Sequence, residues 1–110
     1  MIRNLTPHVI VVVLPDGSTI TLPPDPAGPA RIGTVVEPIG SVAHDSGVMI
    51  PVVRSRLSEP INLPAGEVGV FLVVSAIVRT ARPDRLDLLS PGELVRGPDG
   101  QPIGCKGLAR

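Results

Sequence analysis

His8-Val9-Ile10-Val11-Val12-Val13-Leu14, followed by Pro15-Asp16-Gly17, is the stretch that decides the fold class. After His8 the run is apolar at both alternating positions, which is typical of a strand covered on both faces. Val68 to Val74 repeats this pattern later in the chain. We therefore expect these two strands at the centre of a sheet. Two such strands are hard to cover within one short chain, so we also expect a homo-oligomer.

The turn after the first run predicts its partner strand. Pro15-Asp16-Gly17 supplies a fixed φ, a side chain that bonds its own turn, and a residue tolerant of positive φ. Ser18 to Leu22 should therefore return antiparallel, with Ile20 and Leu22 facing the core.

The other apolar runs are also short, and turn residues end each of them. The segment 23–29 holds four prolines and predicts a stiff extended loop. Further strands are expected over 30–36 (ended by Glu37-Pro38), over 39–43, and over 48–57 after a turn at 45–47. Pro51 places the strand 48–57 at a sheet edge or gives it a bulge.

The last third of the chain predicts one short helix and a hairpin. Ser75 can cap a helix over 75–82 that buries Ile77, Val78 and Ala81, with Pro83 ending it, although a strand remains an alternative for this segment. Ser90-Pro91-Gly92-Glu93 fits a type II turn. Gly97-Pro98-Asp99-Gly100 should join two strands, 94–96 and 102–106.

The fold class that follows is mainly β. We expect one small β-rich domain spanning 1–110, a barrel or sandwich with at most one short helix at about 75–82.

Composition and charge exclude several classes of partner. Ten basic residues balance ten acidic ones and Phe71 is the only aromatic residue, which argues against nucleic acid. No basic leader and no run of membrane-spanning length is present, so we expect no membrane association and a cytoplasmic location. Nine of the ten basic residues are arginine, in keeping with a G+C-rich genome.

Three arginines are the strongest ligand-binding candidates. Arg79, Arg82 and Arg85 lie close enough in sequence to bind phosphate or carboxylate together. Asp84 and Asp87 lie among them, so the competing interpretation is a self-paired surface cluster.

The remaining candidates are weaker. His8, in Asn4-Leu5-Thr6-Pro7-His8, is either a ligand contact or a satisfied residue at the start of the strand, with Asn4 or Thr6 bonding local backbone. Cys105 forms no disulfide, and would be a nucleophile only beside His8 or His44; a small buried strand residue is the simpler interpretation. We expect no metal site, no cofactor and no catalytic residue, since neither zinc-ligand spacing nor a nucleotide-binding or nucleophile motif is present.

Three motifs together resemble a family of small tailed-bacteriophage, prophage and actinobacterial proteins. The motifs are Asn-Leu-Thr-Pro-His at 4–8, Val-Val-Ser-Ala-Ile-Val at 73–78, and the segment 90–107 ending in Ile-Gly-Cys-Lys-Gly; the segment 27–47 departs from the pattern. The family has no assigned function, so the resemblance implies a setting, which is the host cytoplasm if a phage encodes the protein, and no site residues.

Three functional hypotheses follow. The first is a non-catalytic phage or prophage accessory protein that binds a host or phage protein, as a homo-oligomer. The second is a protein that binds or sequesters a nucleotide-like anionic small molecule through the arginines. The third, and least favoured, is a cysteine-dependent enzyme.

Overall fold

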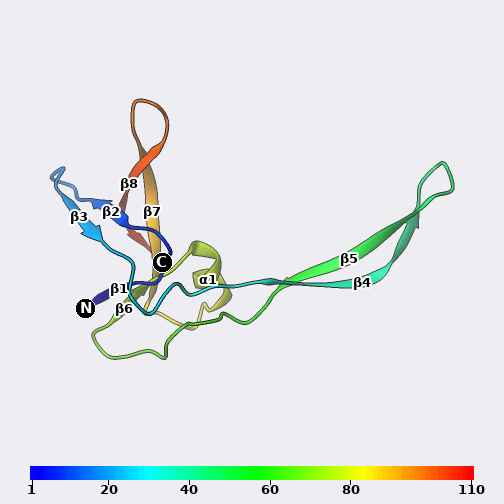
Figure 1. The fold of residues 1–110 in the computed structure, drawn as a ribbon, viewed down its shortest axis with the longest axis horizontal. Coiled ribbons are helices and arrows are strands. Elements are labelled where there is room, and N and C mark those ends of the chain that lie inside the picture. Colours follow the sequence, from blue (N-terminus) through cyan, green and yellow to red (C-terminus); the bar gives the residue numbers. More distant parts are fainter.

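A six-stranded sheet forms the body of the protein, and its two edges nearly meet to give a barrel (Figure 1). The computed structural model describes all 110 residues. The strands follow the order β1 (Ile2–Asn4), β6 (Phe71–Val73), β7 (Leu88–Arg96), β8 (Pro102–Ala109), β2 (Ile10–Val13) and β3 (Thr19–Leu22). The Asp25 amide donates to the Asn4 carbonyl at 2.8 Å, so the chain leaving β3 is tied to β1. The predicted mainly-β single domain is confirmed, and of the two expected architectures, barrel and sandwich, the structure shows the barrel.

The hydrophobic core lies on both faces of β6. Val73 packs with Ile10, Val12 and Cys105 on one face. A second cluster on the other face combines Leu72 and Val74 with four residues from other segments, namely Leu5, Ala30, Val78 and Leu88. The short β6 is therefore the strand that both clusters cover, and this agrees with its two-faced apolar sequence.

The two strands expected at the centre each lie next to an edge strand, β6 beside β1 and β2 beside β3, while β7 and β8 occupy the middle of the sheet. Both are also shorter than predicted. β2 lies between β8 and β3, with Ile10 and Val12 buried, but Val9 precedes the strand and is 56% exposed. β6 has only three residues, and Val68 is fully exposed in a turn before it.

The β2–β3 hairpin forms as predicted, with the Leu14 amide donating to the Ser18 carbonyl at 2.8 Å. Leu22 packs on the core, but the prediction for Ile20 is wrong because half of its side chain is exposed. β3 is an edge strand, and no strand lies beyond it to cover Ile20.

The predicted helix is present as α1 (Ala76–Ala81), and Ser75 caps it by accepting a hydrogen bond from the Val78 amide. Val78 is buried as expected and Ala81 partly so, whereas Ile77 is half exposed, contrary to prediction. With six residues, α1 is too short to cross a membrane, and it is the only helix.

The type II turn predicted at 90–93 is wrong, because these residues lie inside β7. Pro91 is tolerated there since β6 pairs only with Leu88 and Leu89, which leaves the next part of that edge of β7 free. A Cβ on Gly92 would come within 3 Å of two carbonyl oxygens of β8. The glycine thus permits close approach of two strands rather than a turn. The turn at 97–100 joins β7 to β8 as predicted.

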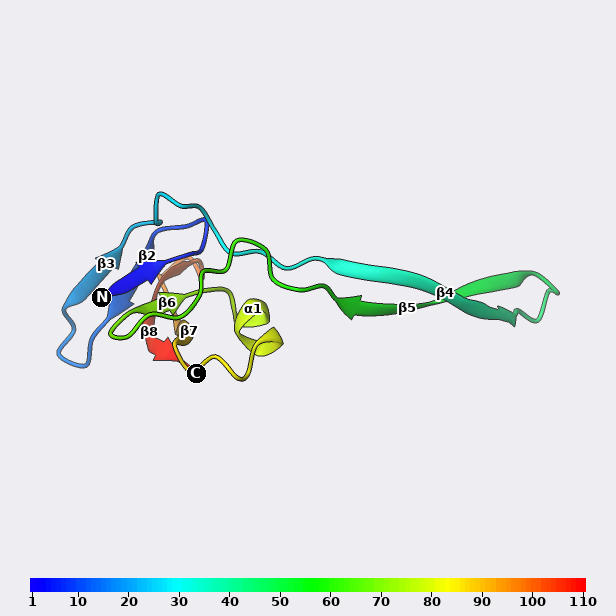
Figure 2. The ribbon, with the colours of Figure 1, turned by 90° about the horizontal axis from the view of Figure 1, so that it is seen from below.

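A long hairpin extends from the barrel and forms a separate two-stranded sheet (Figure 2). Its strands are β4 (Thr34–Ala43) and β5 (Met49–Leu57), which we call the arm together with their connecting turn. The arm gives the molecule a length of 61 Å. The predicted break at Glu37-Pro38 is wrong, since β4 continues through it with only a bulge between Pro38 and Gly40. The expected edge position of Pro51 is confirmed.

Side-chain hydrogen bonds hold the root of the arm. The Asn62 amide nitrogen donates to the carbonyl oxygens of Ala27, Gly28 and Pro29, at 3.0 to 3.3 Å. Asn62 adopts a positive φ of 62°, a conformation that asparagine tolerates better than most residues. The loop 23–29 is therefore fixed against the segment that follows β5.

Candidate functional site

The Asn-Leu-Thr-Pro-His motif closes the barrel. Asn4 is buried, and its amide nitrogen donates to the carbonyl oxygens of His8 and Leu22, both at 2.8 Å. Its side-chain oxygen accepts from the Thr6 amide at 3.0 Å and from the Thr6 hydroxyl at 2.7 Å. All four hydrogen-bonding positions of the carboxamide are thus used, and one of them joins β1 to β3. The prediction that Asn4 or Thr6 bonds local backbone is confirmed.

The three candidate arginines line one cavity of about 300 Å³. Arg79 lies in the last turn of α1, Arg82 caps its C-terminus, and Arg85 follows in the next turn. Arg110, at the end of the chain, lines the same cavity. The fold therefore adds a fourth arginine that the sequence analysis missed, because it is distant in sequence from the other three.

Two of the arginines are already paired with carboxylates. Arg85 makes two hydrogen bonds to Asp87, at 2.8 and 2.9 Å, and one to the Pro64 carbonyl at 3.0 Å. Arg82 makes the same bidentate contact with Asp84, through hydrogen bonds of 3.1 and 3.2 Å. These hydrogen bonds lower the pKa of both aspartates and raise the pKa of both arginines. The interpretation as a self-paired cluster therefore holds for Arg82 and Arg85.

Arg79 differs from its two neighbours in having no carboxylate partner. Its Nε donates to the hydroxyl of Ser90, a buried residue of β7, at 2.9 Å. This hydrogen bond orients the guanidinium and leaves its two terminal nitrogens without a protein acceptor. Arg110 likewise takes part in none of the ion pairs of the structure.

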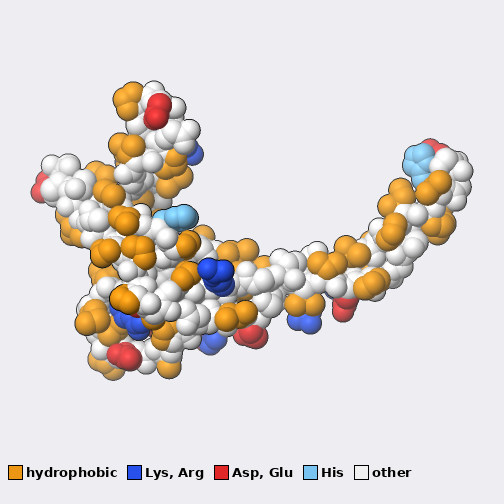
Figure 3. Space-filling view, viewed as in Figure 1, with side chains coloured by type: hydrophobic (Ala, Val, Ile, Leu, Met, Phe, Trp, Pro, Cys, Tyr) orange, Lys and Arg blue, Asp and Glu red, His pale blue; other side chains and the backbone are white.

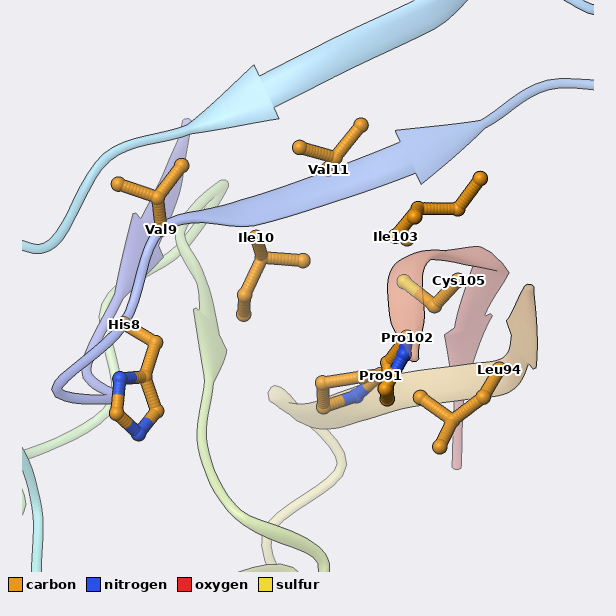
Figure 4. Close-up of a pocket in the computed structure, with 10 residues that line it drawn as sticks. His8, Val9, Ile10, Val11, Pro91, Leu94, Pro102, Ile103 and Cys105 are labelled. Atoms are coloured by element: carbon orange, nitrogen blue, oxygen red, sulfur yellow. The ribbon is translucent and has the colours of Figure 1, made fainter. Parts of the chain in front are cut away.

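His8 lies in a different cavity, of about 320 Å³, between β2 and the β7–β8 hairpin. Figure 4 shows Ile10 and Cys105 pointing into this space, with His8 at the opposite end from Cys105. The lining is mostly apolar and includes three half-exposed side chains, those of Val9, Leu94 and Ile103. His8 thus does not join the arginines, and the predicted set of four residues is divided between two cavities.

The thiol of Cys105 is buried in the barrel, which confirms the simpler interpretation of this residue. His44, the other predicted partner of Cys105, lies at the tip of the arm, where its ring bonds Ser46 at 2.8 Å. No three His, Cys, Asp or Glu side chains lie close enough to hold a metal ion.

The arm is the largest feature that the sequence analysis did not foresee. All of its strand side chains are exposed except that of Val52, which is half buried. Large apolar side chains occur along its whole length, as orange atoms in Figure 3. Those of the two strands and the adjoining turn are Val35, Val36, Ile39, Val42, Val48, Met49, Ile50, Val53 and Leu57. The sequence predicted the strands but contained no signal that they leave the barrel.

Comparisons with protein-family models, with curated proteins and with solved structures give no match to this chain. The resemblance to phage and actinobacterial proteins accordingly stays a prediction.

Proposed function

We propose that this chain is a non-catalytic binding protein, of the phage or prophage accessory kind, that acts as a homo-oligomer and engages a host or phage protein. The observation that carries the proposal is the arm, whose apolar side chains find no cover within the chain. Contiguous exposed apolar surfaces mark protein-interaction sites. An isolated two-stranded hairpin is also marginally stable in water, so the arm gains stability from a partner.

The buried state of Cys105 supports the non-catalytic part of the proposal. A nucleophilic thiol must be reachable and close to a base. This thiol is buried, His8 lies at the opposite end of the cavity that both residues line (Figure 4), and His44 lies at the tip of the arm. A folded-state thiol titration should find Cys105 inert. Rapid modification of the native protein would reopen the enzymatic hypothesis.

Affinity capture with an arm variant as its control tests the binding role. Tagged full-length protein is incubated with lysate of an actinobacterial host, in parallel with a Val36→Glu/Val53→Glu variant. We expect a partner that the unaltered protein retains and the variant loses. A strictly monomeric protein that captures no arm-dependent partner would contradict the proposal.

Arg79 and Arg110 favour a second candidate function, the binding of a nucleotide-like anion. Both line one cavity and lack carboxylate partners, and Ser90 holds the Arg79 guanidinium in place. Planar guanidinium groups bind phosphate in a bidentate geometry. Native mass spectra of the protein purified from such a host should then show an added mass that denaturation removes.

Titration calorimetry with ADP tests the same cavity directly. Arg79→Ala and Arg110→Ala should each weaken binding at least about tenfold, whereas Arg54→Ala, an exposed arm residue paired with Glu37, should not. Equal affinities for all four proteins would rule out this cavity as an anion site.

A further inference from the structure

The two faces of the arm differ in charge, and this difference indicates how the arm is covered. Side chains of paired strands alternate between the faces, so the register assigns each residue to one of them. One face carries the charged residues Glu37, Arg54 and Arg56. The other, which we call the neutral face, carries no charge at all. Its members are Thr34, Val36, Pro38, Ser41, Ala43, Met49, Pro51, Val53, Ser55 and Leu57.

The space-filling view agrees with this division. In Figure 3 blue and red side chains project from the lower margin of the inner half of the arm, and its upper margin carries none before the tip. Val36, Met49 and Val53, all on the neutral face, are each about half exposed.

The edges of the arm are poorly suited to pairing with another strand. In an antiparallel ladder, every second residue pair directs its backbone N–H and C=O groups toward the partner strand. The Ser58 amide donates to the Gly33 carbonyl and the His44 amide to the Val48 carbonyl, so the pairs Gly33–Ser58 and His44–Val48 are of this kind. Counting from either end, Pro38 and Pro51 fall at positions whose backbone groups point outward. Each edge therefore lacks an amide donor near its middle, a common protection against edge-to-edge association. This favours contact of the arm with a partner through one of its faces.

Resting on the homo-oligomer of the proposed function, we propose that the neutral face packs against the neutral face of a second copy. An uncharged surface can face itself across a two-fold axis without placing like charges together. Glu37, Arg54 and Arg56 then stay in water on the outer side, together with the apolar side chains of that face, those of Val35, Val42, Ile50 and Val52. The product is a four-stranded, two-layer sandwich, which has the strand number that an isolated hairpin lacks.

The area is sufficient for such a pair. A two-stranded ribbon of ten residues is about 33 Å long and roughly 15 Å wide with its side chains. Two such faces bury about 1,000 Å² in total, which reaches the threshold for a specific interface.

A matched pair of charge insertions tests the face. Val53 lies on the neutral face and Val42 on the charged face, and the two are 49% and 54% exposed, so neither substitution should disturb the barrel. Molar mass is measured by light scattering over a range of micromolar concentrations for wild type, Val53→Glu and Val42→Glu. Circular dichroism and thermal melting check that each variant is folded.

We expect wild type and Val42→Glu to form dimers of similar stability. The Val53→Glu dimer should have a dissociation constant at least about 100-fold higher, because two carboxylates per dimer would be buried without partners. Equal dimerisation of both variants would overturn the neutral-face contact while leaving the proposed homo-oligomer intact. Loss of the dimer in Val42→Glu, alone or together with Val53→Glu, would overturn the assignment to one face. A wild-type monomer would overturn both the neutral-face contact and the homo-oligomer. If a different protein is then captured by wild type and not by Val53→Glu, that protein is the one that binds the neutral face.

Discussion

At the scale of single residues, the buried Asn4 supplies the side-chain hydrogen bond that joins β1 to β3. Its carboxamide makes four hydrogen bonds in a buried position, and no buried side-chain polar atom of the protein lacks a partner. A polar group that loses its partner in such a site costs more than the hydrogen bond gained on folding.

Asn4→Ala should therefore destabilise the protein by about 2–4 kcal/mol, because the carbonyls of His8 and Leu22 and the amide and hydroxyl of Thr6 each lose one hydrogen bond. Asn4→Asp keeps the shape but turns an oxygen toward the carbonyls of His8 and Leu22, so it should cost at least as much at neutral pH. Urea unfolding measures both values. A change below about 0.5 kcal/mol in either variant would contradict the role of Asn4.

The Arg85–Asp87 pair makes stability depend on pH. Its hydrogen bonds hold the pKa of Asp87 below the value in the unfolded chain. A carboxyl group with a lowered folded pKa contributes stability above its unfolded pKa of about 3.9 and loses it as pH falls through the folded pKa. Arg85 stays charged throughout this range.

We expect the melting temperature of wild type to exceed that of Asp87→Asn at neutral pH. The difference should narrow as pH falls below about 4, since Asp87 then becomes neutral. Thermal melts of both proteins between neutral and strongly acidic pH measure this. A difference that stays constant with pH would show that the ion pair does not contribute.

At the scale of elements, close contact between β7 and β8 depends on Gly92. A Cβ there would lie 2.4 Å from the Lys106 carbonyl oxygen and 2.9 Å from that of Gly107. Backbone atoms in a paired strand cannot move aside cheaply. At Gly97, by contrast, the nearest atom is a side-chain carbon of Ile103 at 3.2 Å.

Gly92→Ala should therefore cost about 3 kcal/mol, and Gly97→Ala less than about 1 kcal/mol. Chemical unfolding of the two variants and of wild type measures both losses in the free energy of unfolding. Similar costs at both positions would mean that the strands can separate at Gly92 without penalty.

At the scale of the whole molecule, the barrel and the arm should be independent in stability. None of the 13 buried residues lies in β4 or β5. The hydrogen-bonded pair Gly33–Ser58 offers a natural place to shorten the hairpin.

Replacing 34–57 by Asn-Gly, a sequence suited to a two-residue hairpin turn, should leave the barrel folded. We expect its melting temperature to shift by no more than about 4 °C and its homo-oligomer to dissociate. Thermal melting and light scattering measure the two effects. Unfolding of the shortened chain would show that the arm supports the barrel.

The local pattern of the sequence determined the β class, the β2–β3 and β7–β8 hairpins, and helix α1 with its Ser75 cap, because apolar alternation and turn chemistry act between near neighbours. Gly92 was misassigned because only the backbone of β8, distant in sequence, reveals that it serves close approach. Which residues line the same cavity likewise depends on tertiary packing. Packing places Arg110 in the cavity that Arg79 lines and His8 in the other one.

The tertiary structure alone decided that β4 and β5 leave the barrel. Their Val and Ile residues are the same types that fill the core. Residue type therefore does not distinguish a strand buried in the barrel from one exposed in the arm. The pairing of the strands decides it physically: the Asn4 side chain joins the two outer strands β1 and β3, whereas β4 and β5 pair only with each other, so their hairpin extends into solvent.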